Sequence, residues 1–415
     1  MSKLRKKVYL TAGYNTVSFG TGRKEFNPKK PRPGIEHYIT EAGRGSIAQI
    51  NDAKNIDEGV ISNFMAARFC KQGNLAGFIP EIDPALEYKP STRVEGACGS
   101  GGMALVTAMK TVLSELADTV LTIGVEVQNT VKAIYGADIL AGAGHYASER
   151  KEGHAYFFPA KFSDRAGVYY QKFGYEPTRK GMALWYEQMI KNARKNPKAQ
   201  EYQNSIEDLF GAGMTPPNPK AFVENLNIYD CSKVSDGASA LIFASEEGLK
   251  RLGINKKDAI EVVGYGQCEA NLTKQPEDPT RLLTTQKAAE KAYQMTGLGP
   301  KDIGLLEVHD CFTITGLLAL EAAGFAEYGK GAALVESGKT RIDGEIPTNP
   351  GGGLIGFGHY VGGTGVRQAV DCIHELTGKA NGYQVKINSN RPYAMMISMG
   401  GNDKTVTAMI FKKAE

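Results

Sequence analysis

The segment 117–127 constrains the fold of this chain more than any other stretch of its sequence. Its residues, ADTVLTIGVEV, form a nearly continuous run of apolar and β-branched side chains. A strand of this composition is usually covered on both faces, as in a parallel sheet with helices packed on each side. We therefore expect an α/β protein, in which strands and amphipathic helices alternate along the chain.

Two similar series of strands and helices follow one another. In the first series we expect strands at 7–12, 117–127 and 234–244, and helices at 34–50, 57–72 and 101–117. In the second we expect strands at 260–267, 303–308, 393–400 and 403–412, and helices at 284–297, 312–324 and 363–377. Two such series predict an internally duplicated α/β fold, with one half at 1–250 and the other at 258–415.

The segment from about 130 to 233 differs in amino-acid composition from the segments on either side. It is rich in aromatic residues, Lys, Asn and Pro, and it offers few strand candidates. The strand pattern resumes at 234–244, so the segment interrupts an α/β unit instead of ending it. We expect 130–233 to be a loop domain inserted into the first half.

Composition excludes several classes of protein. The formal charge of +4 is small for 415 residues, which argues against nucleic acid as a partner. Six cysteines lie far apart with no CxxC pair, so neither a disulfide framework nor a metal site is indicated. No run approaches the roughly 18 apolar residues of a membrane span, and no secretory leader is evident. These features favour a soluble, cytoplasmic protein.

The first candidate for chemistry is Cys98, in the segment RVEGACGSGGMAL at 93–105. The glycines join an extended segment to a helix, which places Cys98 at a helix N-terminus. There the free N–H groups and the helix dipole favour the thiolate, the nucleophilic form of cysteine. The competing interpretation is a buried, inert cysteine. A GxGxxA match at 99–104 also fits a dinucleotide-binding turn, but that function would leave the other candidate residues without a role.

Two further segments place reactive side chains at turns. In EVHDCF at 307–312, an apolar strand ends in His309, Asp310 and Cys311, and ligands bind at that end of a strand in open α/β sheets. The glycine-rich segment 349–365 surrounds His359. A thiolate nucleophile needs a base, and acyl transfer also needs a proton donor and oxyanion donors. These residues together with Cys98 would supply that set.

The ordered motifs resemble the thiolase superfamily, specifically the sterol-carrier-protein-2 type. They are the Cys98 turn, DCSKVSDGA at 230–238, HDCF at 309–312, NPGGG with its Gly-His at 349–359, and SMGG at 398–401. The resemblance spans nearly the whole chain. It implies duplicated αβαβα layers with an inserted loop domain, and a ping-pong reaction on acyl-CoA thioesters. Coenzyme A would be a co-substrate, with no covalently bound cofactor.

The resemblance also implies a role for each reactive residue. Cys98 would be the acylated nucleophile, and His359 its activating base and later an oxyanion donor. His309 would help to form the first oxyanion hole. The backbone N–H groups of Cys98 and Gly400 would form the second.

The chain departs from the usual family pattern at two positions. Most thiolases have an acid/base cysteine where this chain has Ser398, and in the sterol-carrier type the HDCF cysteine, here Cys311, takes that role. The usual proline after the catalytic histidine is Tyr360 here. Its loss would loosen the pose of His359, and the tyrosine ring would lie near the acyl site.

Within the family, the aromatic insertion, the missing proline and the segment 7–26 are most similar to the catalytic subunits of benzoylsuccinyl-CoA thiolases of anaerobic toluene degradation. This similarity implies cleavage of 2-benzoylsuccinyl-CoA into benzoyl-CoA and succinyl-CoA, and a small zinc-ribbon/OB-fold partner subunit. The candidate side chains are Tyr156, Phe157, Phe158, Tyr169, Tyr170 and Tyr360 for an aryl pocket, Arg367 or Lys161 for a carboxylate, and Lys161, Arg179 and Lys180 for CoA phosphate. Core or solvated-surface positions are the alternative for each.

Two rival functions stay open. One is an acetoacetyl-CoA-type biosynthetic thiolase or a related condensing enzyme, although the HDCF motif argues against condensing enzymes, which normally use histidine with asparagine or glutamate. The other is a non-catalytic acyl-CoA- or lipid-binding subunit, which the four reactive side chains disfavour. The family usually forms dimers or tetramers, so a homo-oligomer is expected.

Overall fold

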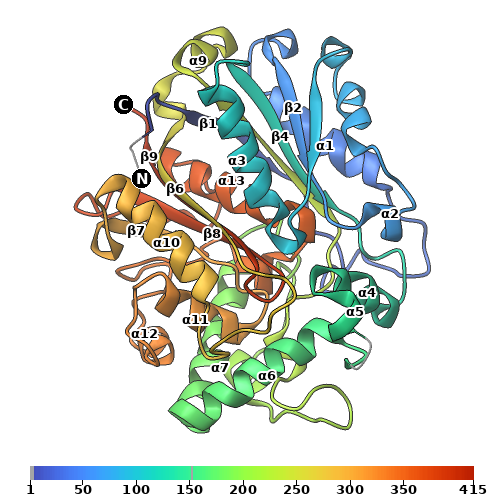
Figure 1. Cartoon of the computed structure of the whole chain (residues 1–415), viewed down its shortest axis with the longest axis vertical. Coiled ribbons are helices and arrows are strands. Elements are labelled where there is room, and N and C mark those ends of the chain that lie inside the picture. Colours follow the sequence, from blue (N-terminus) through green and yellow to red (C-terminus); the bar gives the residue numbers. More distant parts are fainter. Residues whose placement is uncertain (1–3, 151–152) are drawn as a thin grey trace.

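The computed structural model describes residues 4–150 and 153–415, and Figure 1 shows their arrangement. The strands are β1 (Tyr9–Asn15), β2 (Glu58–Ser62), β3 (Ser91–Val94), β4 (Thr119–Glu126), β5 (Gly237–Ala244), β6 (Ile260–Glu269), β7 (Ile303–Glu307), β8 (Tyr393–Gly400) and β9 (Thr405–Lys413). The helices are α1 (Ile35–Ile47), α2 (Ala66–Phe69), α3 (Ser100–Leu113), α4 (Ala133–Leu140), α5 (Tyr146–Glu149), α6 (Phe157–Phe173), α7 (Tyr175–Ala193), α8 (Leu209–Met214), α9 (Glu246–Leu252), α10 (Leu283–Thr296), α11 (Thr313–Ala322), α12 (Gly331–Glu336) and α13 (Thr364–Thr377).

These strands form one mixed sheet in the order β3-β2-β4-β5-β1-β6-β9-β8-β7. β2 pairs in parallel with β3 and β4, and β7 pairs in parallel with β8, whereas the other neighbours are antiparallel. The two series of strands meet where β1 pairs with β6, through Tyr9 with Glu261 and Leu10 with Ile260. Each half of the chain therefore supplies one end of a shared sheet.

Two buried helices, α3 and α13, lie between the two ends of the sheet (Figure 1). Leu105 of α3 and Val370 of α13 belong to one apolar core, which also contains Phe243 of β5 and Met396 of β8. On the outer faces, α1 packs against the first half of the sheet and α10 against the second. The expected α/β fold with αβαβα layers is confirmed.

The predicted strand at 117–127 is β4, and all eight of its residues are buried, as its apolar composition requires. The helix predicted at 57–72 is wrong. Residues 58–62 form β2, which pairs with a strand on each side, and only the short α2 follows it. Burial between two parallel neighbours outweighs the helical spacing of apolar residues in that segment.

Segment 130–233 lies within the first half of the sequence but packs on the second half of the fold. Its helices α6 and α7 share a core with α10, α11 and the outer face of β8 and β9 (Figure 1). At its end, Asp230 pairs with Arg179 of α7, with Nη1–Oδ2 and Nη2–Oδ1 distances of 2.7 and 2.5 Å. The Thr313 hydroxyl donates to the same carboxylate at 2.6 Å, which ties the segment to α11. Within the described residues, no helix has the length and apolar character to cross a membrane.

The Arg179–Asp230 pair yields a prediction about stability. Both side chains are fully buried, so Arg179→Met leaves an uncompensated charge inside the protein, a change that typically costs about 3–5 kcal/mol. We expect a loss of that size in the free energy of unfolding measured by urea denaturation. Lys180→Met is the matched control, because Lys180 is exposed and pairs only with Glu336 at the surface, a contact worth about 1 kcal/mol or less. Equal losses for the two variants would contradict this account.

Candidate active site

Cys98 lies in a tight turn that leads directly into α3. The turn is a 3-10 segment, Ala97–Gly99, and Ala97 has a φ of +53°, in the left-handed region. Gly99 is needed because a Cβ there would lie 3.0 Å from the carbonyl oxygen of Thr405. The expected position of Cys98 at a helix N-terminus is confirmed.

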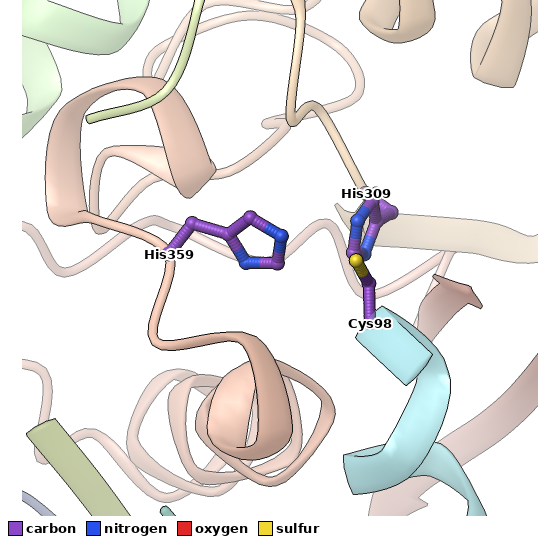
Figure 2. A group of neighbouring side chains, drawn as sticks. All are labelled: Cys98, His309 and His359. Atoms are coloured by element: carbon purple, nitrogen blue, oxygen red, sulfur yellow. The ribbon is translucent and has the colours of Figure 1, made fainter. Parts of the chain in front are cut away.

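Three side chains from separate parts of the chain meet at this turn (Figure 2). The Cys98 Sγ and one ring nitrogen each of His309 and His359 lie within 4.8 Å of one another. The two imidazole rings are 5.1 Å apart between centroids and nearly perpendicular, at 87°. His309 follows β7, and His359 comes from the glycine-rich segment. The structure thus brings together three of the four residues that the sequence predicts as catalytic in one cluster.

The cluster has the ligand types of a zinc site, but its surroundings do not fit one. A metal-ligating histidine almost always bonds its other ring nitrogen to a carboxylate, a carbonyl or water. His309 is 2% exposed, and neither of its ring nitrogens has a hydrogen-bond partner among the described residues. These nitrogens suit the recognition of a substrate oxygen better than a metal.

His359 is held by several hydrogen bonds. Its backbone N–H donates to the Ser235 hydroxyl at 2.8 Å, and its carbonyl accepts from the Gln128 amide at 2.9 Å. Its Nδ1 lies 2.7 Å from the Thr364 hydroxyl, which donates to the carbonyl of Tyr360 at 3.3 Å. In the tautomer in which Nδ1–H donates to Thr364, and the Thr364 hydroxyl donates to the carbonyl of Tyr360, Nε2 keeps its lone pair. The missing proline therefore does not leave His359 loose, contrary to the expectation from the sequence.

Cys98 and His359 are both neutral in the resting protein. Burial raises the pKa of the Cys98 thiol to about 12, although the N–H groups of Gly401 and of Cys98 itself oppose the shift. Burial, and then the charge of Arg367, lower the pKa of His359 to about 3. The expectation that the helix N-terminus favours a thiolate is wrong for the resting protein, because desolvation outweighs the helix dipole. A neutral imidazole beside a neutral thiol can still accept its proton when a substrate is attacked.

Cys311 is the fourth predicted catalytic residue, and it is buried beside the cluster. Its Sγ lies 3.9 Å from the Thr315 hydroxyl. Burial raises its pKa well above the ordinary range, and a charge on Cys98 would raise it further. The thiol is therefore protonated, as a proton donor must be.

Asp310, between the two predicted catalytic residues of HDCF, anchors the motif. Its carboxylate accepts from the Trp185 indole N–H at 3.0 Å and from the Leu354 N–H at 2.7 Å. These bonds join the HDCF segment to α7 and to the glycine-rich segment, and so fix His309 and Cys311 relative to His359. Burial raises the pKa of Asp310 to about 7.

Glu126 at the end of β4 is a second anchor that the sequence reasoning missed. It is fully buried and accepts hydrogen bonds from the N–H groups of Phe64, Met65 and Gly362. It thereby joins the loop after β2 to the segment that follows His359. A carboxylate inside the apolar run 117–127 is the sequence signal that could have revealed it.

Apolar side chains surround the nucleophile. Cys98 packs in a small cluster formed by Phe64, Met65, Ala97, Leu140, Ala143, Phe158 and Val361. Phe158, a predicted substrate-binding residue, thus lies in the cluster that also contains Cys98.

Several other predicted binding residues are structural. Arg367 is fully buried, with its Nη2 3.2 Å from Glu307 and a second ion pair to Asp371, so it faces no substrate carboxylate. Tyr360 is fully buried as well, and its hydroxyl lies 2.7 Å from that of Ser239, which places the ring in the core instead of near the acyl site. The lost proline has been replaced by a packing residue.

One predicted phosphate ligand and two aromatic candidates are also excluded. Arg179 is fully buried and bound to Asp230, whereas Lys180 is exposed, pairs with Glu336 of α12 at the surface and stays a prediction. The hydroxyls of Tyr169 and Tyr170 donate to Glu321 and to the carbonyl of Asn225, inside the helical core. Sequence reasoning could not exclude these residues because their partners come from distant segments.

Lys161, Phe157 and Tyr156 lie near a cavity of the insertion. Lys161 and Phe157 line a cavity of about 510 Å³, together with Glu149, His154 and Phe222. The Lys161 ammonium pairs with Glu149 at 2.8 Å and lies 5.5 Å from the centre of the Phe157 ring. The partly buried Tyr156 ring packs 5.4 Å from Phe222 on the same wall.

Comparison with known proteins identifies relatives along both halves. The model of the thiolase N-terminal domain matches residues 47–247, and the thiolase C-terminal domain-like model matches residues 266–413. Acetyl-CoA acetyltransferase of Methanothermobacter thermautotrophicus is 34% identical over 90% of this chain and 94% of its own length. The enzyme of that name from Methanocaldococcus jannaschii is 33% identical, over 93% and 96%. Benzoylsuccinyl-CoA thiolase subunit BbsB of Thauera aromatica is 28% identical, over 92% of each chain.

Solved structures share the fold along the whole chain. The Ltp2-ChsH2(DUF35) aldolase superposes with a TM-score of 0.77 at 21% identity, covering 99% of this chain and 98% of the other. Human mitochondrial 3-ketoacyl-CoA thiolase in complex with CoA superposes with a TM-score of 0.71 at 17% identity, covering 100% of both chains.

The raised pKa of Cys98 predicts how its reactivity depends on pH. A group with a pKa of about 12 gains thiolate throughout the accessible range, whereas an ordinary cysteine, with a pKa of about 8.5, is fully ionised by about pH 10. We expect alkylation of Cys98 by iodoacetamide, followed by mass spectrometry of its peptide, to accelerate roughly tenfold per pH unit from about pH 7 to about pH 10. A rate that levels off below about pH 8 would show that the resting thiol is already activated.

Proposed function

The chain belongs to the thiolase family of acyltransferases, and on that basis we propose that it cleaves a 3-oxoacyl-CoA with CoA through an acyl-enzyme on Cys98. The observation that carries the proposal is the convergence of the Cys98 thiol with His309 and His359, with the Cys311 thiol buried beside them. Each chemical role that such a reaction needs can then be assigned to a residue.

In the first step, the Cys98 sulfur attacks the 3-oxo carbon of the substrate. The neutral Nε2 of His359 accepts the thiol proton, while Thr364 holds the opposite ring nitrogen. The negative charge that develops on the substrate oxygen needs donors that are already in place. The backbone N–H groups of Cys98 and Gly400 would supply them, since the N–H of Gly400 lies against the Cys98 turn.

In the second step, the bond between carbons 2 and 3 breaks. Its electron pair stays on carbon 2 of the departing acyl-CoA, whose thioester oxygen would be stabilised by His309 and His359. Cys311 gives its proton to carbon 2, and the acyl group remains on Cys98 as a thioester. The thiol of a second CoA gives its proton to the Cys311 thiolate and attacks this thioester, and the proton held by His359 returns to Cys98, which leaves as a thiol. Run in reverse, the same steps form a carbon–carbon bond.

The acyl group that Cys98 carries should be apolar. Cys98 packs against a cluster of aliphatic and aromatic side chains, and the nearby His309 and His359 are neutral, so a carboxylate there would lose its hydration without gaining a cation. An acetyl group, as in acetoacetyl-CoA cleavage, fits this environment, and the two archaeal relatives named above are called acetyl-CoA acetyltransferases.

A second candidate substrate is 2-benzoylsuccinyl-CoA, which would place a benzoyl group on Cys98 and release succinyl-CoA. Phe158, in the apolar cluster against which Cys98 packs, favours an aryl group, and BbsB of Thauera aromatica, named as a benzoylsuccinyl-CoA thiolase subunit, is a relative along 92% of the chain. The proposed role of this protein in toluene catabolism depends on 2-benzoylsuccinyl-CoA being its substrate. Lys161 is then the remaining candidate for the substrate carboxylate, since Arg367 is buried in ion pairs.

For coenzyme A itself, we propose the cavity of about 510 Å³ at the start of α6. It is lined by Lys161 and Phe157, and Phe157 packs 5.1 Å from Phe158 of the Cys98 cluster. A chain entering through this cavity would therefore reach the nucleophile past Phe158.

We also propose that the protein works as a homo-oligomer, with a small zinc-ribbon/OB-fold subunit as a further candidate partner. Within the described residues, β3 pairs only with β2, so one edge of the sheet is open for a second copy. The partner subunit is suggested by the solved structure of the Ltp2-ChsH2(DUF35) aldolase, whose name contains two components. A cytoplasmic location is in keeping with six unpaired cysteines.

A product screen tests the proposed function. Purified protein is incubated with CoA and either acetoacetyl-CoA or 2-benzoylsuccinyl-CoA, with and without the candidate partner, and thioester products and the mass of the Cys98 peptide are measured. We expect acyl adducts on Cys98 and new acyl-CoA products, both absent in Cys98→Ala. Absence of products and of adducts with every substrate would overturn the proposal. A Cys98→Ala protein that still supported growth in place of the natural one would favour the non-catalytic binding subunit.

The role of Cys311 gives a sharper prediction. Cys311→Ala should lose carbon–carbon cleavage by about 10²–10⁴-fold, the usual contribution of a positioned acid. Exchange of the acyl group between acetyl-CoA and labelled CoA needs only Cys98 and His359, so it should stay within about threefold of the natural protein. The ratio of the two rates is the measurement. Parallel loss of both reactions would mean that Cys311 acts on the structure of the site instead of on carbon 2.

A further inference from the structure

The turn between β8 and β9 touches the nucleophile directly. The N–H of Gly401 faces the Cys98 sulfur, where it opposes the rise in the pKa of the thiol. Gly400 packs so closely on the cysteine turn that a Cβ there would lie 2.3 Å from the carbonyl oxygen of Gly96. Any movement of the turn 400–404 therefore moves the backbone donors that face the sulfur and the substrate oxygen.

Asp403 fixes this turn to the start of α10. Its carboxylate is 5% exposed and accepts from the N–H groups of Thr284 and Thr285 at 2.8 and 3.0 Å, and from the Thr285 hydroxyl at 2.7 Å. The residue at the usual capping position of α10 is Leu282, whose side chain makes no capping bond. Asp403 thus caps the helix from another segment, and the helix N-terminus favours its negative charge.

Arg165 of α6 fixes the same turn from the opposite side. Its guanidinium is 2% exposed; Nε donates to the Asn402 side chain at 2.6 Å, and Nη1 donates to the carbonyls of Pro279 and Arg281 at 2.8 and 2.9 Å. The bond to Asn402 joins the inserted segment to the turn. The bonds to the two carbonyls join it to the loop that precedes α10.

We propose that Asp403 and Arg165 are positioning residues, which clamp the turn 400–404 between α10 and α6 so that the N–H groups of Gly400 and Gly401 keep their places against Cys98. Neither side chain touches the reacting atoms. The proposal rests on the thiolase function proposed above. Its physical basis is that a donor displaced by about 1 Å can cost as much as about 10²-fold in rate.

The conformation of the turn fits this role. Gly401 and Asp403 have φ angles of +61° and +62°, in the left-handed region. Aspartate is one of the few side chains that adopt it readily. Asp403 can therefore end the turn and cap α10 at the same time.

The test compares Asp403→Ala, Asp403→Asn and Thr285→Val, assayed with the substrate found in the product screen. We expect Asp403→Ala to lower kcat by about 10- to 100-fold while KM changes by less than about threefold, since ground-state binding is untouched. Asp403→Asn, which keeps an acceptor oxygen, and Thr285→Val, which removes one bond, should give intermediate losses. Thr285→Val also keeps the test valid if Asp403→Ala does not fold.

The matched control is Asp208→Ala. Asp208 caps α8 through the Gly211 N–H at 2.7 Å, so the change removes a similar cap far along the chain from the turn. It should lower the free energy of unfolding by about 0.5–2 kcal/mol without lowering kcat. If Asp403→Ala also lost only stability and kept kcat, the positioning role would be refuted while the thiolase function stood. An inactive natural protein would instead refute the function itself.

Discussion

The backbone contact between α3 and α13 is the constraint on which the site depends. A Cβ on Gly101 would lie 2.6 Å from the N of Gly365, and a Cβ on Gly365 would lie 2.4 Å from the N of Gly102. Only glycines allow two helices to begin so close together. Because Cys98 precedes α3 and His359 precedes α13, this contact sets the distance between nucleophile and base. Two helices from different halves of the chain thus act as one rigid support.

Burial determines the electrostatics of the site. It holds Cys98, Cys311, His309 and His359 in their neutral forms, by raising the pKa of each thiol and lowering that of each imidazole. Charge then appears only when a substrate enters, next to donors that are already placed. Such a site stabilises the transition state without first having to reorganise its own dipoles. The fully buried Arg367 adds to this effect, because its charge further disfavours the protonated imidazoles.

The sequence predicts most of the fold and the three side chains that the structure brings together, Cys98, His309 and His359, because each of these leaves a local pattern. Continuous apolar strands, glycine turns and the HDCF and Gly-His motifs are visible without knowing what they contact. The wrong predictions about binding residues have a common physical cause: the folded chain pairs each of these side chains with a residue that is distant in the sequence. Arg179, Arg367 and Tyr360 look available in the sequence, yet Asp230, Glu307 and Ser239 occupy them. Two further features leave no local pattern in the sequence. One is the capping of α10 by Asp403, and the other is the burial of Cys98, which raises the pKa of its thiol and so disfavours the thiolate.

The site is assembled from three parts of the molecule, and this limits which substitutions it can accept. The two halves bring Cys98 to His309 and His359, whereas the inserted segment supplies Phe158 to the apolar cluster against which Cys98 packs, and Arg165 beside the turn at 402. Phe158 therefore lies on the same helix, α6, as a side chain that holds this turn in place. A substitution in α6 that reshapes the acyl pocket will also strain the turn, unless the bonds of Arg165 are kept.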